Sequence, residues 1–273
     1  MKNKIVLITG ATDGIGKQTA IDLALMGASL ILHGRSKERL LKTRDEITKL
    51  TDNHKTDIIG SDFSSLNQVK TMAEEIISGF EHLGVLINNA GVYMKEKQLT
   101  ENGFEITFAV NHLAHFLLTN YLIDLSKLQP TARIINVSSV AHTRANLDFG
   151  NLNSEKSFNA YNSYAVSKLA NVLFTYELSG MLKGTGITVN ALHPGVINTK
   201  LLWEGFKIQG APLSEGAETP VYLASSDEVN DITAKYFVRK KETPSSEASY
   251  NKNNREMMWH LSEQMIEDSI GKN

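Results

Sequence analysis

The sequence predicts an α/β fold in three layers, with a seven-stranded, mainly parallel sheet between two layers of helices. Short apolar runs rich in β-branched residues alternate with longer segments of helical pattern along the chain, which is the order that βαβ units produce. The first of these runs, 5–8, is apolar at every position and is followed by Thr9 and Gly10, as expected of a strand that is buried on both faces.

Seven strands and seven helices are predicted in chain order. The strands are 5–8, 30–32, 57–59, 85–87, 133–137, 187–191 and 235–238. Helical patterns cover 14–26, 36–50, 64–80, 103–125, 162–183, 215–224 and 255–270, and the polar stretch 243–250 is predicted to be a loop. The hydroxyls of Ser64 and Ser65 can cap the third helix, and Gly27, Gly184 and Gly186 stop helices.

Composition excludes several classes of protein. The 273 residues include no cysteine, which excludes disulfide scaffolds, cysteine-ligated zinc, iron–sulfur clusters and thiol nucleophiles. Lys and Arg number 28 against 30 Asp and Glu, so no basic excess points to nucleic acid. No apolar run reaches the ~18 residues of a membrane helix, and the N-terminus lacks a signal-peptide pattern. Without a repeat or linker, we expect one domain over 1–273, no nucleic-acid partner, no membrane span and a cytoplasmic location.

A glycine-rich turn joins the first strand to the first helix. Thr9-Gly10-Ala11-Thr12-Asp13-Gly14-Ile15-Gly16 has the spacing Gly-x3-Gly-x-Gly. Glycine permits a tight turn there and lets backbone N–H groups and the positive end of the helix face a pyrophosphate, as in Rossmann-type dinucleotide-binding folds. Methyltransferases and plain structural turns also use such a segment, so the turn alone does not decide between these interpretations.

The end of the second strand bears on which dinucleotide would bind. His33-Gly34-Arg35-Ser36 lies about 20 residues past the glycine turn, where an acid would bond the free 2′-hydroxyl of NAD and an arginine would match the 2′-phosphate of NADP. The acid is missing and Arg35 is present, so NADP(H) is the expected cofactor and NAD(H) the alternative. Asp13 argues the other way, since it adds negative charge near the phosphates, and Arg35 can also be a solvated surface residue.

Tyr164 and Lys168 are four residues apart in a segment with a helical pattern, so their side chains share one face. A nearby ammonium lowers the pKa of a phenol, which is about 10 when free, toward the working range of an acid–base catalyst. The same spacing also occurs in exposed helix pairs. The weight of this pair therefore depends on the motifs around it.

Six motifs in one order make the chain similar to the short-chain dehydrogenase/reductase family from Lys4 to about Val238. They are Thr9-Gly-x3-Gly-Ile-Gly16, Asn88-Asn89-Ala90-Gly91, Asn111, Asn136-Val137-Ser138-Ser139, Tyr164-x3-Lys168 and Pro194-Gly195 followed by Thr199. Within the family, four features resemble the branch of the retinol dehydrogenases, WW-domain oxidoreductases and protochlorophyllide reductases. These are Ala141-His142, the run 167–174, His193-Pro194-Gly195-Val196 and the wide gap from Ser139 to Tyr164.

The resemblance implies four catalytic residues. Ser139 would hydrogen-bond the substrate oxygen, and Tyr164 would give or take its proton. Lys168 would lower the pKa of Tyr164 and bind the nicotinamide ribose, and Asn111 would hold the water that continues the proton relay. Ser138 should point elsewhere, because adjacent strand residues alternate between faces. The competing interpretation gives these residues structural roles, as caps of the strand end or as a buried polar group in a helix.

The resemblance also implies which residues would line the cofactor: Asp62 at the adenine, 89–91 on the adenosine side, and Val196 and Thr199 at the carboxamide. The full predicted set is Gly10, Thr12, Asp13, Gly14, Ile15, Gly16, Arg35, Ser36, Asp62, Phe63, Asn89, Ala90, Gly91, Tyr164, Lys168, Pro194, Gly195, Val196 and Thr199. No metal site is predicted. His112 and His115 lack an acidic partner motif and are expected to pack in the core or at the surface.

Together these features predict an NADP-dependent oxidoreductase that interconverts a carbonyl and an alcohol. Hydride would move from the nicotinamide to the carbonyl carbon while Tyr164 protonates the oxygen. Residues 200–216 are expected to form a lid over the substrate, and 243–273 a C-terminal extension. Apolar side chains in the lid indicate an apolar small-molecule substrate, namely Leu201, Leu202, Trp203, Phe206 and Ile208.

Two other functions compete with this prediction. A catalytically idle dinucleotide-binding sensor or scaffold would not need the intact set of Asn111, Ser139, Tyr164 and Lys168. A methyltransferase would not account for Tyr-x3-Lys. Retinoid substrates are not expected, because the membrane-anchoring segment common in the resembling branch is missing from the sequence. The substrate, the physiological direction and the oligomeric state, a homo-oligomer included, stay open.

Overall fold

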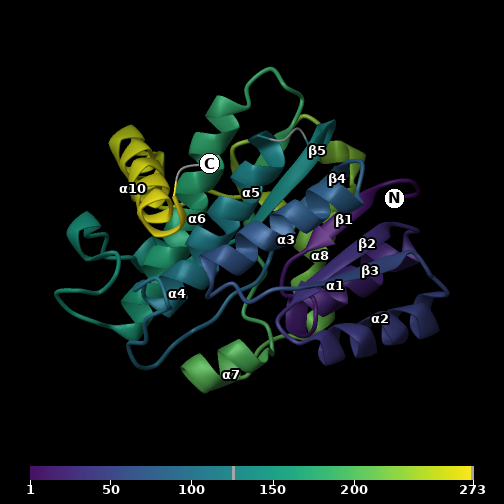
Figure 1. Cartoon of the computed structure of the whole chain (residues 1–273), viewed down its shortest axis with the longest axis horizontal. Coiled ribbons are helices and arrows are strands. Elements are labelled where there is room, and N and C mark those ends of the chain that lie inside the picture. Colours follow the sequence, from purple (N-terminus) through teal and green to yellow (C-terminus); the bar gives the residue numbers. More distant parts are fainter. Residues whose placement is uncertain (125–126, 272–273) are drawn as a thin grey trace.

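The computed structural model describes residues 1–124 and 127–271 and shows one central sheet between two layers of helices (Figure 1). Its eight strands lie in the order β3-β2-β1-β4-β5-β6-β7-β8, with the first seven parallel and β8 antiparallel to β7. They are β1 (Ile5–Ile8), β2 (Ser29–Gly34), β3 (Thr56–Gly60), β4 (Leu83–Asn88), β5 (Leu128–Val137), β6 (Thr188–His193), β7 (Lys235–Val238) and β8 (Lys241–Glu242). The seven predicted strands are confirmed, and β8 adds an unpredicted edge strand of two residues.

Helices cover both faces of this sheet. They are α1 (Gly14–Leu25), α2 (Lys37–Thr51), α3 (Leu66–Gly79), α4 (Ile106–Phe108), α5 (Ala114–Asp124), α6 (Ala160–Met181), α7 (Lys200–Phe206), α8 (Leu213–Ser225), α9 (Glu247–Tyr250) and α10 (Lys252–Ile270). One core joins α1, α2 and α8 to the sheet, and a second core on the opposite face joins α3, α5, α6 and α10 to it. In β1, Val6 and Ile8 belong to the first core and Leu7 to the second, so alternation buries these three residues on opposite faces of the sheet.

The predicted helix 103–125 is divided in the structure, and residue 125 lies outside the described residues. The buried carboxylate of Glu105 accepts hydrogen bonds from the N–H groups of Thr107 and Phe108, at 2.9 and 3.1 Å, so the helix begins as α4 three residues later than predicted. A π-helical turn, Ala109–Leu113, then separates α4 from α5. Such turns break the regular i→i−4 bonding, which a hydrophobic pattern does not predict.

Other boundaries also differ from the predictions. The predicted lid contains the short helix α7, which is capped by the Thr199 hydroxyl. The stretch predicted as a loop contains α9. Ser65, and not Ser64, caps α3 by accepting from the N–H of Gln68.

The C-terminal helix α10 lies against α6 and α3 (Figure 1). Trp259 packs on Phe116 of α5 and Phe174 of α6, with ring centroids 4.8 and 5.7 Å apart. Ser262 shares a hydrogen bond of 2.8 Å with the buried ring of His112. The predicted final helix is therefore confirmed as part of the folded core.

The sheet order reverses between β1 and β4, which are neighbours although β2 and β3 lie between them in the sequence. In parallel α/β sheets, ligands bind at the carboxyl ends of the strands where this reversal occurs. The segments that follow β1, β4, β5 and β6 come together at this edge. Motifs that are far apart in the sequence, 9–16, 88–91, 138–139 and 194–199, therefore meet there.

Candidate active site

The glycine turn after β1 forms a cradle that only glycine allows. Gly10 has a φ of +65°, and a Cβ on it would lie 2.8 Å from the Cα of Ala90. A Cβ on Gly16 would overlap the carbonyl oxygen of Gly10. The backbone at the N-terminus of α1 therefore carries no side chain at these positions, and apart from the N–H of Gly14, which Asp13 caps, its N–H groups can face an anion such as a pyrophosphate. This geometry fits a bound dinucleotide.

Asn89 and Thr9 hold the turn against the end of β4. The amide of Asn89 donates to the carbonyls of Thr9 and Gly10, at 2.8 and 3.2 Å. The Thr9 hydroxyl oxygen accepts from the backbone N–H groups of Asn89 and Ala90, at 2.8 and 2.9 Å. The side chain of Asn89, predicted to line the cofactor, therefore supports the cradle from behind.

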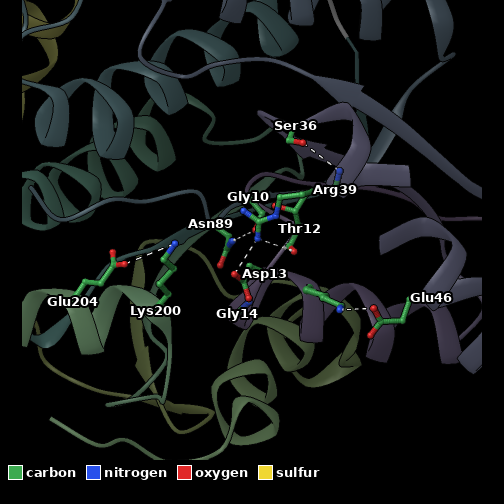
Figure 2. Close-up of polar contacts among 11 residues, drawn as sticks. Gly10, Thr12, Asp13, Gly14, Ser36, Arg39, Glu46, Asn89, Lys200 and Glu204 are labelled. Atoms are coloured by element: carbon green, nitrogen blue, oxygen red, sulfur yellow. Dashed lines mark hydrogen bonds and ion pairs between the residues drawn. The ribbon is translucent and has the colours of Figure 1, made fainter. Parts of the chain in front are cut away.

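The acidic residue of the turn has a basic partner that the sequence analysis missed. Asp13 caps α1 by accepting from the N–H of Gly14 at 2.8 Å, and its other oxygen pairs with the guanidinium of Arg39 at 3.0 Å. Arg39, in the first turn of α2, also donates to the carbonyl of Thr12 at 3.5 Å. Figure 2 shows its side chain extending back across the turn to these two residues. The feature of the sequence that points to Arg39 is its position three residues after Ser36, the cap of α2, which places it in the first turn of that helix.

Arg35 lies at the position that the sequence predicts to contact the 2′ group of the cofactor's ribose. It follows Gly34, where a Cβ would lie 2.7 Å from the Cγ2 of Thr12, so the end of β2 runs directly beside the glycine turn. Arg35 is exposed, and within the described residues it has no ion-pair partner. The structure thus brings two arginines, Arg35 and Arg39, to the side of the turn nearest α2.

The predicted adenine-side residues 62 and 63 differ in character. Asp62 is half-buried and accepts from the N–H and hydroxyl of Ser64, both at 2.9 Å. Phe63 is buried, stacked on His33 at 4.1 Å and edge-on to His115 at 5.3 Å. The side chain of Phe63 therefore belongs to the core, which leaves its backbone as the part that could face a cofactor.

Tyr164, Lys168 and Ser139 converge at the ends of β5 and α6. The Lys168 ammonium lies 5.7 Å from the centre of the Tyr164 ring and donates to the carbonyl of Val137 at 3.0 Å. The Ser139 side chain lies close enough to the Tyr164 hydroxyl to lower its pKa, and its hydroxyl oxygen accepts from the N–H of Ala141 at 3.2 Å. Ser138 turns away and donates to the backbone carbonyl of Lys168 at 2.7 Å, as strand alternation predicts.

Burial determines the protonation states of Tyr164 and Lys168. It raises the pKa of Tyr164 to about 12, an effect that the nearby Ser139 side chain opposes. Burial also lowers the pKa of Lys168 to about 8, because a dry interior disfavours the ammonium. In the protein alone, the cost of burying a phenolate therefore exceeds the effect of its neighbours, and the lowering of the Tyr164 pKa by Lys168 stays a prediction.

Asn111 lies in the π-helical turn and is fixed on all sides. Its amide donates to the carbonyl of Val92 and the hydroxyl of Ser167, each at 3.0 Å, and its side-chain oxygen accepts from the N–H of Val92 at 2.7 Å. Its backbone carbonyl accepts from the ring of His115 at 3.1 Å. A Cβ on Gly91 would meet the side chains of Asn111 and Lys168 at 3.4 and 3.5 Å, so glycine leaves space beside both polar groups.

The loop after β6 forms the opposite wall. Gly195 has a φ of +105°, beside Pro194, and Val196 is exposed. The Cγ2 of Thr199 lies 3.5 Å from the place of a Cβ on Gly14. Thr199, one of the two predicted carboxamide residues, thus faces the glycine turn across the carboxyl edge of the sheet.

An aromatic cluster surrounds Tyr164. Tyr93, which follows β4, lies 5.6 Å from Tyr164, and Phe206 of α7 lies 4.9 Å from Tyr93 and 6.1 Å from Tyr164 between ring centroids. Tyr161 lies 6.2 Å from Phe206. Tyr93 and Tyr161 were not predicted, although Tyr161 shares the helical face of Tyr164 by its spacing. Of the apolar lid residues, Leu201 and Phe206 join this cluster, whereas Trp203 and Ile208 are exposed.

His112 and His115 lie in the core, as expected. His112 bonds Asn171 and Ser262, and His115 bonds the Thr9 hydroxyl at 2.9 Å. In the described part of the chain, no group of three or more His, Cys, Asp or Glu side chains could hold a metal ion. Nor is any helix in 1–124 or 127–271 long and apolar enough to cross a membrane.

Comparison with known proteins places these features in context. A family model described as short chain dehydrogenase matches residues 4–208. Human retinol dehydrogenase 13 is 42% identical over 263 residues, which cover 90% of this chain and 79% of that protein. Human retinol dehydrogenase 14 is 38% identical, with coverage of 97% and 87%.

Solved structures show the same fold. An uncharacterised protein from Mycobacterium paratuberculosis is 30% identical, with a TM-score of 0.82 and coverage of 97% of this chain and 94% of that one. A short-chain dehydrogenase from Shigella flexneri, complexed with NADP, is 22% identical, with a TM-score of 0.72 and coverage of 88% and 98%. At that identity, the second likeness concerns the fold alone.

Proposed function

The chain belongs to the short-chain dehydrogenase family and is an NAD(P)-dependent oxidoreductase, and we propose that it uses NADP(H) to interconvert an apolar carbonyl compound and its alcohol. One observation carries this proposal. A buried tyrosine, Tyr164, lies beside Ser139 and Lys168, next to the space that Gly91 leaves. A protein that only sensed a dinucleotide would not need this arrangement.

Each side chain has a defined task in carbonyl reduction. The hydroxyls of Ser139 and Tyr164 hydrogen-bond the carbonyl oxygen, which orients the substrate and polarises its C=O bond. The bound nicotinamide supplies the hydride. Tyr164 gives its proton to the oxygen as the alcohol forms, and its raised pKa keeps it protonated before that step.

Lys168 and Asn111 complete the proton relay. The Lys168 ammonium stabilises the tyrosinate that proton transfer leaves behind. Asn111 lies close to Lys168, since a Cβ on Gly91 would meet both side chains, and a water held by Asn111 can return a proton through Lys168. In alcohol oxidation the same groups act in reverse, with Tyr164 as the base.

The choice of NADP(H) is supported by charge beside the glycine turn. Arg35 directly follows β2 and Arg39 extends from α2 to Asp13 (Figure 2), so two basic residues are available beside the glycine turn to pair with a 2′-phosphate. No acidic residue stands at the end of β2 to accept from the free 2′-hydroxyl of NAD. NAD(H) is the weaker alternative.

The walls around Tyr164 support an apolar substrate. Tyr93, Tyr161 and Phe206 come from three different segments and present ring faces and edges near the reacting hydroxyl. Leu201 belongs to the same cluster. We propose that α7 and the following loop, within 200–216, form the lid that closes over the substrate. The relatives named retinol dehydrogenases make retinaldehyde a compound to test.

The function can be tested with a panel of carbonyl compounds, by measuring the consumption of NADPH through its absorbance. The panel should include retinaldehyde, aromatic aldehydes, apolar ketones and small polar aldehydes, each with NADPH and with NADH. We expect NADPH-dependent reduction of at least one apolar carbonyl and weaker turnover of the small polar ones. NADPH binding by calorimetry without turnover of any compound, in either direction, would instead support the sensor or scaffold.

A further inference from the structure

His142 joins the segment that carries Ser139 to the C-terminal part of the chain. Its Nδ1 lies 2.7 Å from the carbonyl oxygen of Ser139, and its backbone N–H donates to the same oxygen at 3.1 Å. On the other side of the ring, the backbone N–H of Ser246 donates to Nε2 at 3.1 Å. The two residues that this ring connects are more than one hundred positions apart in the sequence.

These two contacts fix the tautomer of the ring. A carbonyl oxygen can only accept, so Nδ1 carries the proton and donates to Ser139. A backbone N–H can only donate, so Nε2 carries no proton and accepts from Ser246. Both conditions are met by the neutral imidazole with its proton on Nδ1. Burial of the ring, which is 1% exposed and packs on Tyr236 at 4.8 Å, lowers the pKa of His142 and keeps it neutral.

The segment behind His142 is itself anchored to the helix that carries Tyr164. The hydroxyl of Tyr176, three turns along α6, is 2.7 Å from the hydroxyl of Ser245. Ser245 is also bonded to Ser249, and the Tyr250 hydroxyl accepts from its N–H at 3.0 Å. A continuous set of hydrogen bonds therefore runs from α6 through Ser245 and Ser246 to His142, and from there to Ser139.

We propose that His142 is a positioning residue of the oxidoreductase: it holds the Ser139 backbone from the 245–250 segment, so that the Ser139 hydroxyl stays aligned with Tyr164. This inference rests on the proposed function. Ser139 directly follows β5 and caps a short 3-10 turn, Val140–Arg144, whose first i→i+3 bond runs from the N–H of His142 to the Ser139 carbonyl. The bond from the His142 ring is the second bond to this oxygen, and it is the one that connects Ser139 to the 245–250 segment.

Two amide variants separate the contacts of the ring. The amide nitrogen of His142→Asn can take the place of Nδ1 and donate to Ser139, but the side chain is too short to reach Ser246. The amide oxygen of His142→Gln can take the place of Nε2 and accept from Ser246, while the donor to Ser139 is lost. We expect His142→Gln to lower kcat by about tenfold to a hundredfold, as for a small misplacement of a catalytic group.

His142→Asn should lower kcat less than His142→Gln does, so that kcat of the two variants differs by a factor of roughly five or more. KM for the carbonyl substrate and the dissociation constant of NADPH should change by less than about threefold in both, because neither site contains His142. His260→Gln is the matched control, since it makes the same chemical change at a side chain that is 80% exposed on α10. Thermal unfolding of each variant establishes that it is folded.

A double-mutant cycle with Ser139→Ala decides whether His142 acts through Ser139. Without the Ser139 hydroxyl there is nothing left to align, so His142→Gln should cause little further loss of kcat in the Ser139→Ala protein. Losses that multiply, or equal losses in His142→Gln and His142→Asn, would overturn the positioning role. If Ser139→Ala alone leaves kcat unchanged, the proton relay of the proposed function fails instead.

Ser246→Pro provides a second route if His142→Gln does not fold. It removes the N–H donor to Nε2 and leaves the imidazole in place, and the φ of Ser246, −66°, is one that proline adopts. We expect kcat to fall in this variant and the fall to disappear in the Ser139→Ala background. A kcat equal to that of the unmodified protein would contradict the inference.

Discussion

The carboxylate of Asp13 and the guanidinium of Arg39 form an ion pair of 3.0 Å at the turn between β1 and α1. By sequence alone, Asp13 argues against a cofactor with an extra phosphate. In the structure its charge is balanced by Arg39, and both side chains are more than half exposed. An exposed pair of this kind is weak, so Arg39 can exchange the carboxylate for a phosphate that carries more charge.

Replacing Arg39 therefore tests cofactor choice. We expect Arg39→Ala to lower kcat/KM with NADPH by about tenfold, the value of one charge-assisted hydrogen bond, and to leave kcat/KM with NADH nearly unchanged. Lys37→Ala is the matched control, because Lys37 is an exposed cation in the same helical turn. Measurements at one salt concentration are needed, since the contact is ionic. Equal losses in the two variants would mean that only general positive charge matters.

Arg35 offers the opposite experiment. In Arg35→Asp the new carboxylate can accept from a free 2′-hydroxyl and repels a 2′-phosphate, so the preference should change from NADPH to NADH. For the unmodified protein we expect NADPH to be preferred by roughly tenfold to a hundredfold in kcat/KM. A preference for NADH in the unmodified protein, or a ratio that Arg35→Asp does not move, would exclude Arg35 as the reader of the phosphate.

Tyr164→Phe removes the proposed acid and keeps the ring. We expect kcat to fall by about 10²- to 10⁴-fold, the range for loss of a general acid, with NADPH affinity little changed. Ser179→Ala is a suitable control for loss of a buried hydroxyl on the same helix, because its partner Thr233 is not part of the hydrogen bonds that reach Ser139. Residual turnover of Tyr164→Phe near that of the unmodified protein would remove Tyr164 from the mechanism.

The parts of the site that could be predicted are those in which a local pattern has one physical solution. Gly10 and Gly16 must be glycine because another backbone passes within contact distance, and Tyr164 and Lys168 share a face because they are one helical turn apart. The seven parallel strands could be predicted for a similar reason, since strands that are buried on both faces form short apolar runs in the sequence.

Long-range contacts could not be predicted from the same patterns. The spacing of Arg39 after Ser36 places it in the first turn of α2 but does not show that it folds back onto Asp13, and no pattern shows that Ser246 donates to His142. The π-helical turn at Asn111 depends on side-chain bonds to Val92 and Ser167 rather than on periodicity. The raised pKa of Tyr164 likewise reflects burial by segments from several parts of the chain.

Buried neutral histidines predict how stability depends on pH. Burial lowers the pKa of His33, His112 and His193 to about 4, and that of His115 to about 3, against 6.5 in the unfolded chain. As pH falls below 6.5, the unfolded chain binds protons that the folded protein does not, so the free energy of unfolding decreases. Each such histidine contributes up to about 1.4 kcal/mol per pH unit between 6.5 and its folded pKa.

Urea unfolding at pH 7, 6 and 5 measures this dependence in a range where carboxylates change little. His112→Gln should be less stable at pH 7, because it disturbs the bonds to Asn171 and Ser262, yet its stability should fall less steeply on acidification. His260→Gln should keep the slope of the unmodified protein, since His260 is exposed. Identical slopes in His112→Gln and the unmodified protein would mean that His112 titrates normally when folded.

The helix α7 allows a matched test of the substrate wall. Phe206 packs on Tyr93 and faces Tyr164, whereas Trp203, on the same helix, is 57% exposed. We expect Phe206→Ala to raise KM for an apolar carbonyl by about tenfold, because the substrate loses apolar area worth roughly 1.5–3 kcal/mol for a whole side chain, part of which the cluster retains. Trp203→Ala should change KM by less than about threefold, and NADPH affinity should stay constant in both. A larger effect from Trp203→Ala would mean that α7 closes over the substrate with its other face.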